Sequence, residues 1–169
     1  ALHARRGQMT SSTTAHARAI GATTCADLIV QYLGLLDVPY VFGVPGGNID
    51  PLLSALARQQ QASGVRWVLT RSEAGAGFMA DGFARASGRP AACFLITGPG
   101  VVNAATALGQ AYNDSIPILA ISSVNARAQL GRGEGRLHEM RSQSRLIGEV
   151  CSASRTVLAP EALPEALDE

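Results

Sequence analysis

Short runs of consecutive apolar residues alternate along the chain with segments whose apolar residues recur at helical spacing. The runs lie at residues 38–44, 65–70, 91–97, 116–122 and 154–158. Because their apolar residues are continuous rather than alternating, these runs favour strands of a parallel sheet that is covered on both faces. Each run is followed by a turn or loop, such as Pro45-Gly46-Gly47 after the first and Gly98-Pro99-Gly100 after the third.

The segments between the runs predict helices. Thr24 is the expected N-cap of the first helix, and Asn48 or Asp50 caps the second, with Pro51 in its first turn. Further helices are expected at residues 74–86, 101–112 and 137–147, and from residue 164 to the end. The alternation of strands and helices predicts an α/β fold: a three-layer open parallel sheet of about six strands, with helices on both faces and right-handed crossovers.

The chain divides into a tail and one domain. Residues 1–22 are small, polar and mildly basic, so we expect a flexible tail without the apolar core of a secretory signal. Residues 23–169 are long enough for one domain with a sizeable core. Because the pattern stops within the helix that begins near Pro164, we expect this domain to come from a longer protein.

Composition limits the partners of this domain. The net charge of +1 gives no electrostatic reason to bind nucleic acid or an anionic membrane. Hydrophobic residues make up 47% of the chain and charged residues 16%, which indicates contacts with other domains or subunits, unless the abundance of alanine alone explains it.

Three cysteines, Cys25, Cys93 and Cys151, are too far apart for a metal site or a disulfide framework, so we predict no metal ligands and a reducing, cytoplasmic setting. Cys93 lies in an apolar run and is expected in the core. No run of about 18 apolar residues predicts a membrane span.

Function in an open parallel sheet collects at the carboxyl ends of the strands. Three glycine-containing loops lie there, at residues 43–48, 70–74 and 97–103. The segment Gly98-Pro-Gly-Val-Val-Asn103 nearly matches the dinucleotide fingerprint G-x-G-x-x-G, but asparagine replaces the third glycine. The next strand ends in Ser122-Ser123 and carries no ribose-binding acid, so a tight turn is favoured over a nicotinamide site.

Glu73 is the one carboxylate at a predicted strand end, and four small residues, Ala74 to Gly77, follow it. One interpretation is an ordinary acid at a helix N-terminus, where the helix dipole favours negative charge. The other is a partly desolvated carboxylate that shares a proton with a ligand nitrogen, since small neighbours leave room for a ring.

Five linked segments carry a family resemblance. They are Gly43-Val-Pro-Gly-Gly47, Arg71-Ser-Glu-Ala-Gly-Ala76, Met79-Ala-Asp-Gly-Phe-Ala-Arg-Ala-Ser-Gly88, Thr97-Gly-Pro-Gly-Val-Val-Asn-Ala104 and Ala111-Tyr-Asn-Asp-Ser-Ile-Pro117. In this order and spacing they resemble the N-terminal, pyrimidine-binding domain of thiamine-diphosphate enzymes of the acetolactate synthase type. The resemblance covers residues 23–169.

The resemblance implies a role for Glu73. In such enzymes the glutamate at this position hydrogen-bonds ring nitrogen N1′ of the cofactor's aminopyrimidine and so promotes loss of the proton from C2 of its thiazolium ring. The usual stretch is Arg-His-Glu, whereas Ser72 stands here in place of histidine. The other residues expected to bind the cofactor are Pro45, Gly46, Gly47, Thr97 and Asn103.

A second segment, Leu137-His-Glu-Met-Arg-Ser-Gln143, occupies about the place of a Phe-Gln-Glu stretch that lies near the substrate in acetolactate synthase-like chains. With its preceding glycines it looks closer to decarboxylases of 5-guanidino-2-oxopentanoate. Glu139 or Glu134 would then suit the guanidinium, and His138 and Gln143 become substrate candidates. The alternatives are solvated loop acids and a structural histidine.

The Gly-Asp-Gly motif that holds diphosphate and Mg²⁺ in this family does not occur in the chain. The resemblance therefore implies that the middle and diphosphate-binding domains lie elsewhere and that this fragment alone is inactive. It also implies a homodimer or homotetramer that decarboxylates a 2-keto acid. Three alternatives stay open: a carboligase acting on pyruvate, one subunit of a split decarboxylase, and a module without catalytic activity.

Overall fold

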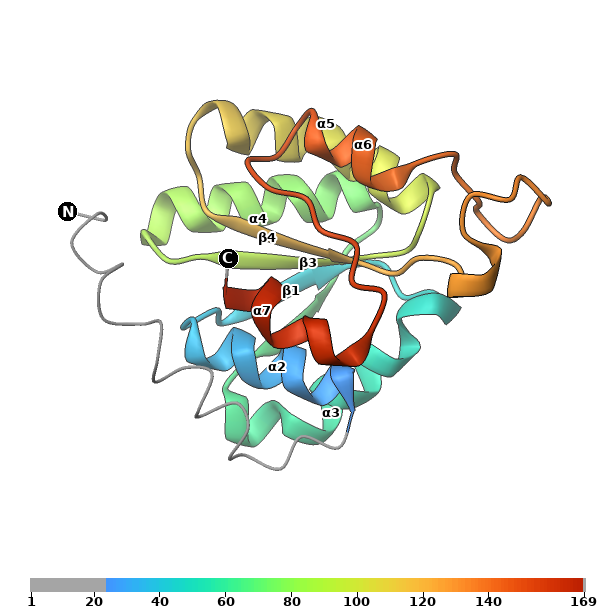
Figure 1. Cartoon of the computed structure of the whole chain (residues 1–169). Helices are drawn as coiled ribbons and strands as arrows, with labels where there is room; N and C mark the ends of the chain where they lie inside the picture. The colour runs from blue at the N-terminus through green and yellow to red at the C-terminus, as the bar shows by residue number, and fades with distance from the viewer. Residues whose placement is uncertain (1–23, 169) are drawn as a thin grey trace.

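The computed structural model describes residues 24–168 and contains one parallel sheet. Its strands are β1 (Tyr40–Gly43), β2 (Arg66–Leu69), β3 (Ala91–Leu95) and β4 (Ile118–Ser122). They pair in the order β2-β1-β3-β4, all parallel (Figure 1). The predicted α/β class with a parallel sheet is confirmed, but the described residues form four strands rather than about six.

Helices cover both faces of this sheet (Figure 1). The α-helices are α2 (Cys25–Leu35), α3 (Asp50–Ser63), α4 (Glu73–Ser87), α5 (Pro99–Asn113), α6 (Gln143–Gly148) and α7 (Leu163–Asp168). Single 3₁₀ turns are η2 (Gly47–Ile49), η3 (Arg127–Gln129) and η4 (Pro160–Ala162). Helices α2, α3 and α7 lie on one face, and α4, α5 and α6 lie on the other.

Burial of β3 on both faces explains why its sequence is continuously apolar. Ala92 and Phe94 join the core cluster beneath α2 and α3, whereas Cys93 and Leu95 join the cluster beneath α4 and α5. Successive side chains of a strand point to opposite faces, so burial of both faces requires an apolar residue at every position. Burial also raises the pKa of the Cys93 thiol to about 12, as expected for a core cysteine.

Hydroxyl side chains cap the N-termini of two helices that pack on the sheet, α2 and α4. The Thr24 hydroxyl accepts a hydrogen bond from the Asp27 backbone N–H at 3.1 Å, which confirms the predicted N-cap of α2. The Ser72 hydroxyl accepts from the Gly75 N–H at 3.1 Å and caps α4. Serine is a better N-cap than most residues, so Ser72 has a structural role at the position where the family usually has histidine.

Two sequence predictions are wrong in the C-terminal third. Residues 154–158 form no strand but cross as coil from α6 to α7, on the other face of the sheet (Figure 1). The helix predicted at 137–147 begins only at Gln143. His138 has φ of 54°, a left-handed conformation that a right-handed helix does not accommodate, and Ser142 supplies the N-cap instead. The tail predicted at 1–22 lies outside the described residues.

Helices α4 and α5 approach most closely at Gly77, where an added Cβ would lie 2.6 Å from Ala107 Cβ. We expect Gly77→Ala to destabilise the domain by about 1–3 kcal/mol, because the two helices must separate. Gly82→Ala on the same helix is the matched control, since nothing lies within 4 Å of its added Cβ. It should be neutral or stabilising by about 0.5–1 kcal/mol, because alanine favours helix. Urea unfolding of both variants checks this; equal destabilisation would contradict the packing explanation.

Candidate active site

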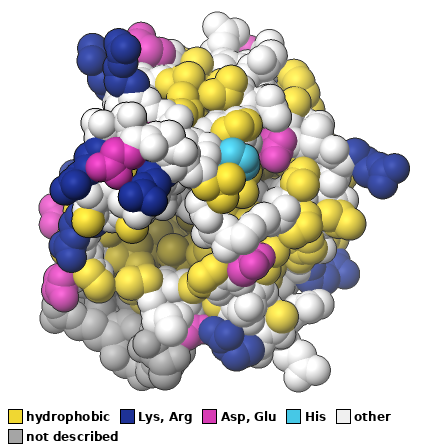
Figure 2. Space-filling view, turned by 90° about the vertical axis from the view of Figure 1, so that its right-hand side faces the viewer, with side chains coloured by type: hydrophobic (Ala, Val, Ile, Leu, Met, Phe, Trp, Pro, Cys, Tyr) yellow, Lys and Arg dark blue, Asp and Glu magenta, His cyan; other side chains and the backbone are white. Residues whose placement is uncertain are grey.

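The carboxyl ends of the four strands meet at one edge of the sheet. The connection from β1 to β2 runs through α3 on one face, and the connection from β3 to β4 runs through α5 on the other. The chain therefore diverges between β1 and β3, which is where open α/β sheets bind ligands. Figure 2 views the molecule from this side and shows a hollow floored by hydrophobic side chains, with charged side chains around it.

Glu73 lies at this edge as the first residue of α4, immediately after β2 and its short loop. Its carboxylate oxygen Oε2 accepts a hydrogen bond from Asn103 Nδ2 at 3.1 Å, and that contact is exposed. No other hydrogen bond to the Glu73 carboxylate occurs within residues 24–168. One carboxylate oxygen is thus held by α5, while the other is free to meet a ligand.

Gly98, the N-cap of α5, and Gly100, in the first turn of that helix, lie between Glu73 and the segment that contains His138; residues 98–100 are called the Gly98–Gly100 turn below. A Cβ at Gly100 would lie 3.5 Å from Glu73 Cγ, and a Cβ at Gly98 would collide with the His138 carbonyl oxygen. Gly98 also has a positive φ of 68°. The His138 contact requires glycine at position 98, whereas at position 100 it is Ile96 Cγ2, 2.6 Å from an added Cβ, that excludes a side chain. Glu73 and His138 lie on opposite sides of this turn.

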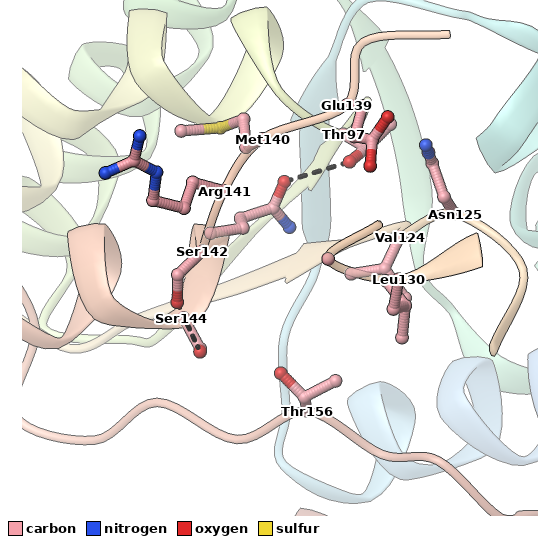
Figure 3. A pocket seen from close by; sticks show the side chains of 12 residues that line it. Thr97, Val124, Asn125, Leu130, Glu139, Met140, Arg141, Ser142, Ser144 and Thr156 are labelled. Atoms are coloured by element: carbon pink, nitrogen blue, oxygen red, sulfur yellow. Dashed lines mark hydrogen bonds between the residues drawn. The ribbon is translucent and has the colours of Figure 1, made fainter. Parts of the chain in front are cut away.

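Gln143 ties the same turn to the end of β4. Its Oε1 accepts hydrogen bonds from Thr97 Oγ1 at 3.0 Å and from the Gly98 N–H at 2.9 Å. Its Nε2 donates to Ser122 Oγ and to the Ser123 carbonyl oxygen, both at 3.1 Å. The structure thus brings together the predicted residues Thr97 and Gln143, but their contact is with each other (dashed line at Thr97 in Figure 3).

His138 is held through its backbone rather than its ring. Its carbonyl oxygen and Cβ lie against Gly98, and its φ of 54° is in the left-handed region. The ring atom Nδ1 is buried and has no hydrogen-bond partner within residues 24–168. A buried polar atom without a partner is costly, so Nδ1 is a candidate contact for a ligand or for another part of the protein.

Two acids have partners within the protein: Glu134, in the glycine-rich loop at residues 131–136, and Glu139, which follows this loop. Glu139 accepts hydrogen bonds from the Arg136 N–H at 3.1 Å and the Gly133 N–H at 2.7 Å, and these bonds lower the pKa of its carboxyl group. Glu134 pairs with Arg136 at 3.2 Å and with Arg132 at 3.7 Å. Glu139 therefore stays ionised, and the charge of Glu134 is shared between two arginines.

A cavity of about 250 Å³ lies beside Gln143 (Figure 3). Its lining residues are Thr97, Val124, Asn125, Leu130, Gly131, Glu139, Met140, Arg141, Ser142, Gln143, Ser144 and Thr156. The Nδ2 atom of Asn125 is buried and lacks a partner within residues 24–168. The sequence did not single out Asn125 or Thr156, because both lie in coil segments whose packing leaves no periodic pattern.

The remaining cofactor candidates lie in the loop after β1. A Cβ at Gly46 would lie 2.7 Å from Ile96 Cδ1, so this loop packs against the end of β3, whereas Pro45 and Gly47 are exposed. Their contact with a cofactor stays a prediction. Residues 24–168 contain no group of three His, Cys, Asp or Glu side chains that could hold a metal ion. No helix within the same residues is long and apolar enough to cross a membrane.

Comparison with known proteins agrees with this fold and with a ligand site at the carboxyl ends of the strands. Residues 23–146 match the family described as thiamine pyrophosphate enzyme, N-terminal TPP binding domain. The chain therefore belongs to the thiamine pyrophosphate (thiamine diphosphate) enzyme family, as its N-terminal cofactor-binding domain.

Individual relatives are enzymes of two kinds. A probable 2-ketoarginine decarboxylase of Pseudomonas aeruginosa is 51% identical over 142 residues, which cover 84% of this chain and 25% of the relative. The acetolactate synthase isozyme 1 large subunit of Escherichia coli is 41% identical over 108 residues, 64% of this chain and 19% of the relative. The chloroplastic acetolactate synthase of Arabidopsis thaliana is 40% identical over 106 residues, 63% of this chain and 15% of the relative. The chain thus spans a quarter or less of these relatives.

The Gly98 turn gives a direct test of how the site is assembled. Gly98→Ala should release the segment around His138, because the added Cβ would collide with the His138 carbonyl oxygen. Gly135→Ala is the matched control: Gly135 has a similar φ of 71°, but nothing lies within 4 Å of its added Cβ. Both variants place an alanine at positive φ, and Gly98→Ala carries further backbone strain because the ψ of Gly98, −110°, lies outside the left-handed helical region. Hydrogen exchange across residues 131–143 should accelerate more in Gly98→Ala; equal acceleration would contradict the contact.

Proposed function

We propose that this chain is the pyrimidine-binding domain of a thiamine-diphosphate-dependent 2-keto acid decarboxylase, and that its substrate is 5-guanidino-2-oxopentanoate (2-ketoarginine). The 51% identity to a probable 2-ketoarginine decarboxylase over 84% of the chain is the observation that carries this proposal. Because the chain covers only 25% of that relative, the activity belongs to the complete protein rather than to this domain alone.

The residues at the sheet edge fit an aminopyrimidine ring. The Glu73 carboxylate has one oxygen bonded to Asn103 Nδ2 and one oxygen without a partner within residues 24–168. A hydrogen bond from the free oxygen to ring nitrogen N1′ therefore requires no rearrangement of the Asn103 contact. A Cβ at Gly47 would have nothing within 4 Å, so the loop after β1 leaves space at this edge.

When bound, thiamine diphosphate would supply a nucleophilic thiazolium carbon and a sink for the electron pair of the bond that is broken. Glu73 holds or releases a proton at the ring nitrogen, and Asn103 fixes the carboxylate for that exchange. Pro45, Gly46, Gly47 and Thr97 are proposed to border the cofactor.

The substrate side of the site is proposed to be the segment from His138 to Gln143. Glu139 is fixed as an anion by two backbone N–H groups, and it lines the cavity of about 250 Å³. A fixed carboxylate beside a cavity suits a guanidinium, which can donate to its remaining lone pairs. Glu134 suits it less, because Arg132 and Arg136 already surround its carboxylate.

The remainder of the enzyme is proposed to lie in other domains and other subunits. Mg²⁺ and the diphosphate would be bound by a second domain. The exposed faces of α4 and α5 carry Phe78, Met79, Val102 and Tyr112, each about half exposed, and would form the contact of a homodimer or homotetramer. A cytoplasmic location is proposed from the three free cysteines.

A second candidate function is carboligation of pyruvate by an acetolactate synthase-type enzyme. It is supported by 41% identity to the large subunit of the Escherichia coli enzyme, over 64% of the chain. The two functions share the step that involves Glu73 and differ in the fate of the decarboxylated intermediate, which is either protonated or added to a second carbonyl group.

Replacement of Glu73 tests the shared step. In the full-length protein with thiamine diphosphate and Mg²⁺, we expect Glu73→Gln to lower carbon dioxide release by about 10²–10⁴-fold, because glutamine cannot exchange the proton. Affinity for the cofactor, measured by calorimetric titration, should change far less. Glu149→Gln, at an exposed position just after α6, is the control and should retain wild-type activity. Equal rates in Glu73→Gln and wild type would sink the assignment.

The charge of the substrate tail tests the choice of substrate. We expect kcat/KM for 5-guanidino-2-oxopentanoate to exceed that for the neutral isostere 5-ureido-2-oxopentanoate by about 10- to 100-fold, the value of one charge-assisted hydrogen bond. Pyruvate should be poorer still. A preference for pyruvate with formation of acetolactate would instead establish the carboligase function.

A further inference from the structure

We propose that Gln143 is a positioning residue that fixes the Gly98–Gly100 turn and, through it, the placement of the His138 segment on the side of that turn opposite Glu73. The family resemblance made Gln143 a candidate substrate residue. The hydrogen bonds of its side chain indicate a different role, in which it acts on the site from within the protein. The catalytic part of this inference rests on the proposed function, whereas its structural part does not.

The Gln143 amide has no free hydrogen-bonding capacity. An amide oxygen accepts two hydrogen bonds and an amide nitrogen donates two. Here Oε1 accepts from Thr97 Oγ1 and the Gly98 N–H, and Nε2 donates to Ser122 Oγ and the Ser123 carbonyl oxygen. All four bonds have lengths of 2.9 to 3.1 Å. A ligand could bind this amide only by displacing one of these partners.

Two of the four partners also fix the orientation of the amide. The Gly98 N–H can only donate, so the Gln143 atom that faces it is the oxygen. The Ser123 carbonyl oxygen can only accept, so the atom that faces it is the nitrogen. A residue that acts as donor on one side and acceptor on the other is required, and glutamine meets both needs without taking up a proton.

The turn that Gln143 holds is shared by the two sides of the site. Gly98 contacts the His138 carbonyl oxygen and Cβ, and Gly100 lies beside Glu73 Cγ. Gln143 also begins α6, five residues after His138, so it anchors the segment that carries this histidine. Loss of the amide therefore frees the turn and the His138 segment together, while Glu73 stays fixed by α4 and Asn103.

The first test removes the amide at constant length. Gln143→Leu in the full-length protein should lower kcat/KM for the 2-keto acid by about tenfold or more, since the Gly98 N–H loses its acceptor and the Ser123 carbonyl oxygen keeps only Ser122 Oγ as a donor. The Kd of thiamine diphosphate should stay within about twofold, because Glu73 is not displaced. Gln110→Leu is the matched control: Gln110 is exposed and bonds only Asp114 among the described residues. It should behave as wild type.

Hydrogen exchange separates this inference from the proposed function. The Gly98 amide is protected by a side-chain acceptor, Gln143 Oε1. Its exchange should accelerate at least tenfold in Gln143→Leu, while peptides from α4 keep wild-type rates. This readout holds even if the substrate is another keto acid or the activity is different. Unchanged exchange at Gly98 would overturn the positioning role, and faster exchange throughout the domain would show a merely structural role.

The second test uses protonation as a rescue. In Gln143→Glu, an ionised carboxylate oxygen would face the Ser123 carbonyl oxygen, and this repulsion disfavours the charged form. The protonated form carries an O–H that can donate to that carbonyl. Activity of this variant relative to wild type should therefore rise as pH falls from about 8 to about 6, toward the raised pKa. A flat ratio across this range, or activity equal to wild type throughout, would contradict the inference.

Discussion

The candidate site depends on one close approach, at the turn Gly98–Gly100. Three segments meet there: the start of α4 with Glu73, the turn itself after β3, and the segment around His138 that returns from β4. An added Cβ would collide with His138 at Gly98 and with Ile96 at Gly100, and the positive φ of Gly98 independently favours glycine. The proposed substrate side of the site thus relies on a backbone contact that contains no ionisable group.

The strands of the sheet could be predicted because each coincides with a run of apolar residues in the sequence. Apolar runs marked β1 to β4, although only β3 is buried at every position and the edge strands β2 and β4 are partly exposed. The hydroxyl of Thr24 marked the start of α2. The same logic misled at residues 154–158, where Val157 and Leu158 resembled a strand but no neighbouring strand pairs with them in the described residues. Apolar character predicts burial more reliably than it predicts hydrogen-bond partners.

The site was predictable only in part, for a different reason. Glu73 and Asn103 lie in motifs of the family, and the structure joins them by one hydrogen bond. Gln143 was found, but its four protein partners lie 20 to 46 residues away and leave no local signal. The acids Glu134 and Glu139 were interpreted by charge alone, and the structure shows that backbone N–H groups and arginines already engage them.

The reach of Gln143 also has a kinetic consequence. Its bond to Thr97 closes a loop with a sequence separation of 46 residues, which includes the whole of α5 and β4. Closing a loop of this size carries an entropic cost that the few bonds of one amide cannot offset until the ends of β3 and β4 are already adjacent. We therefore expect the His138 segment to dock late in folding, after the sheet has formed. Errors in that last step would leave a stable domain whose cofactor side is intact and whose substrate side is not.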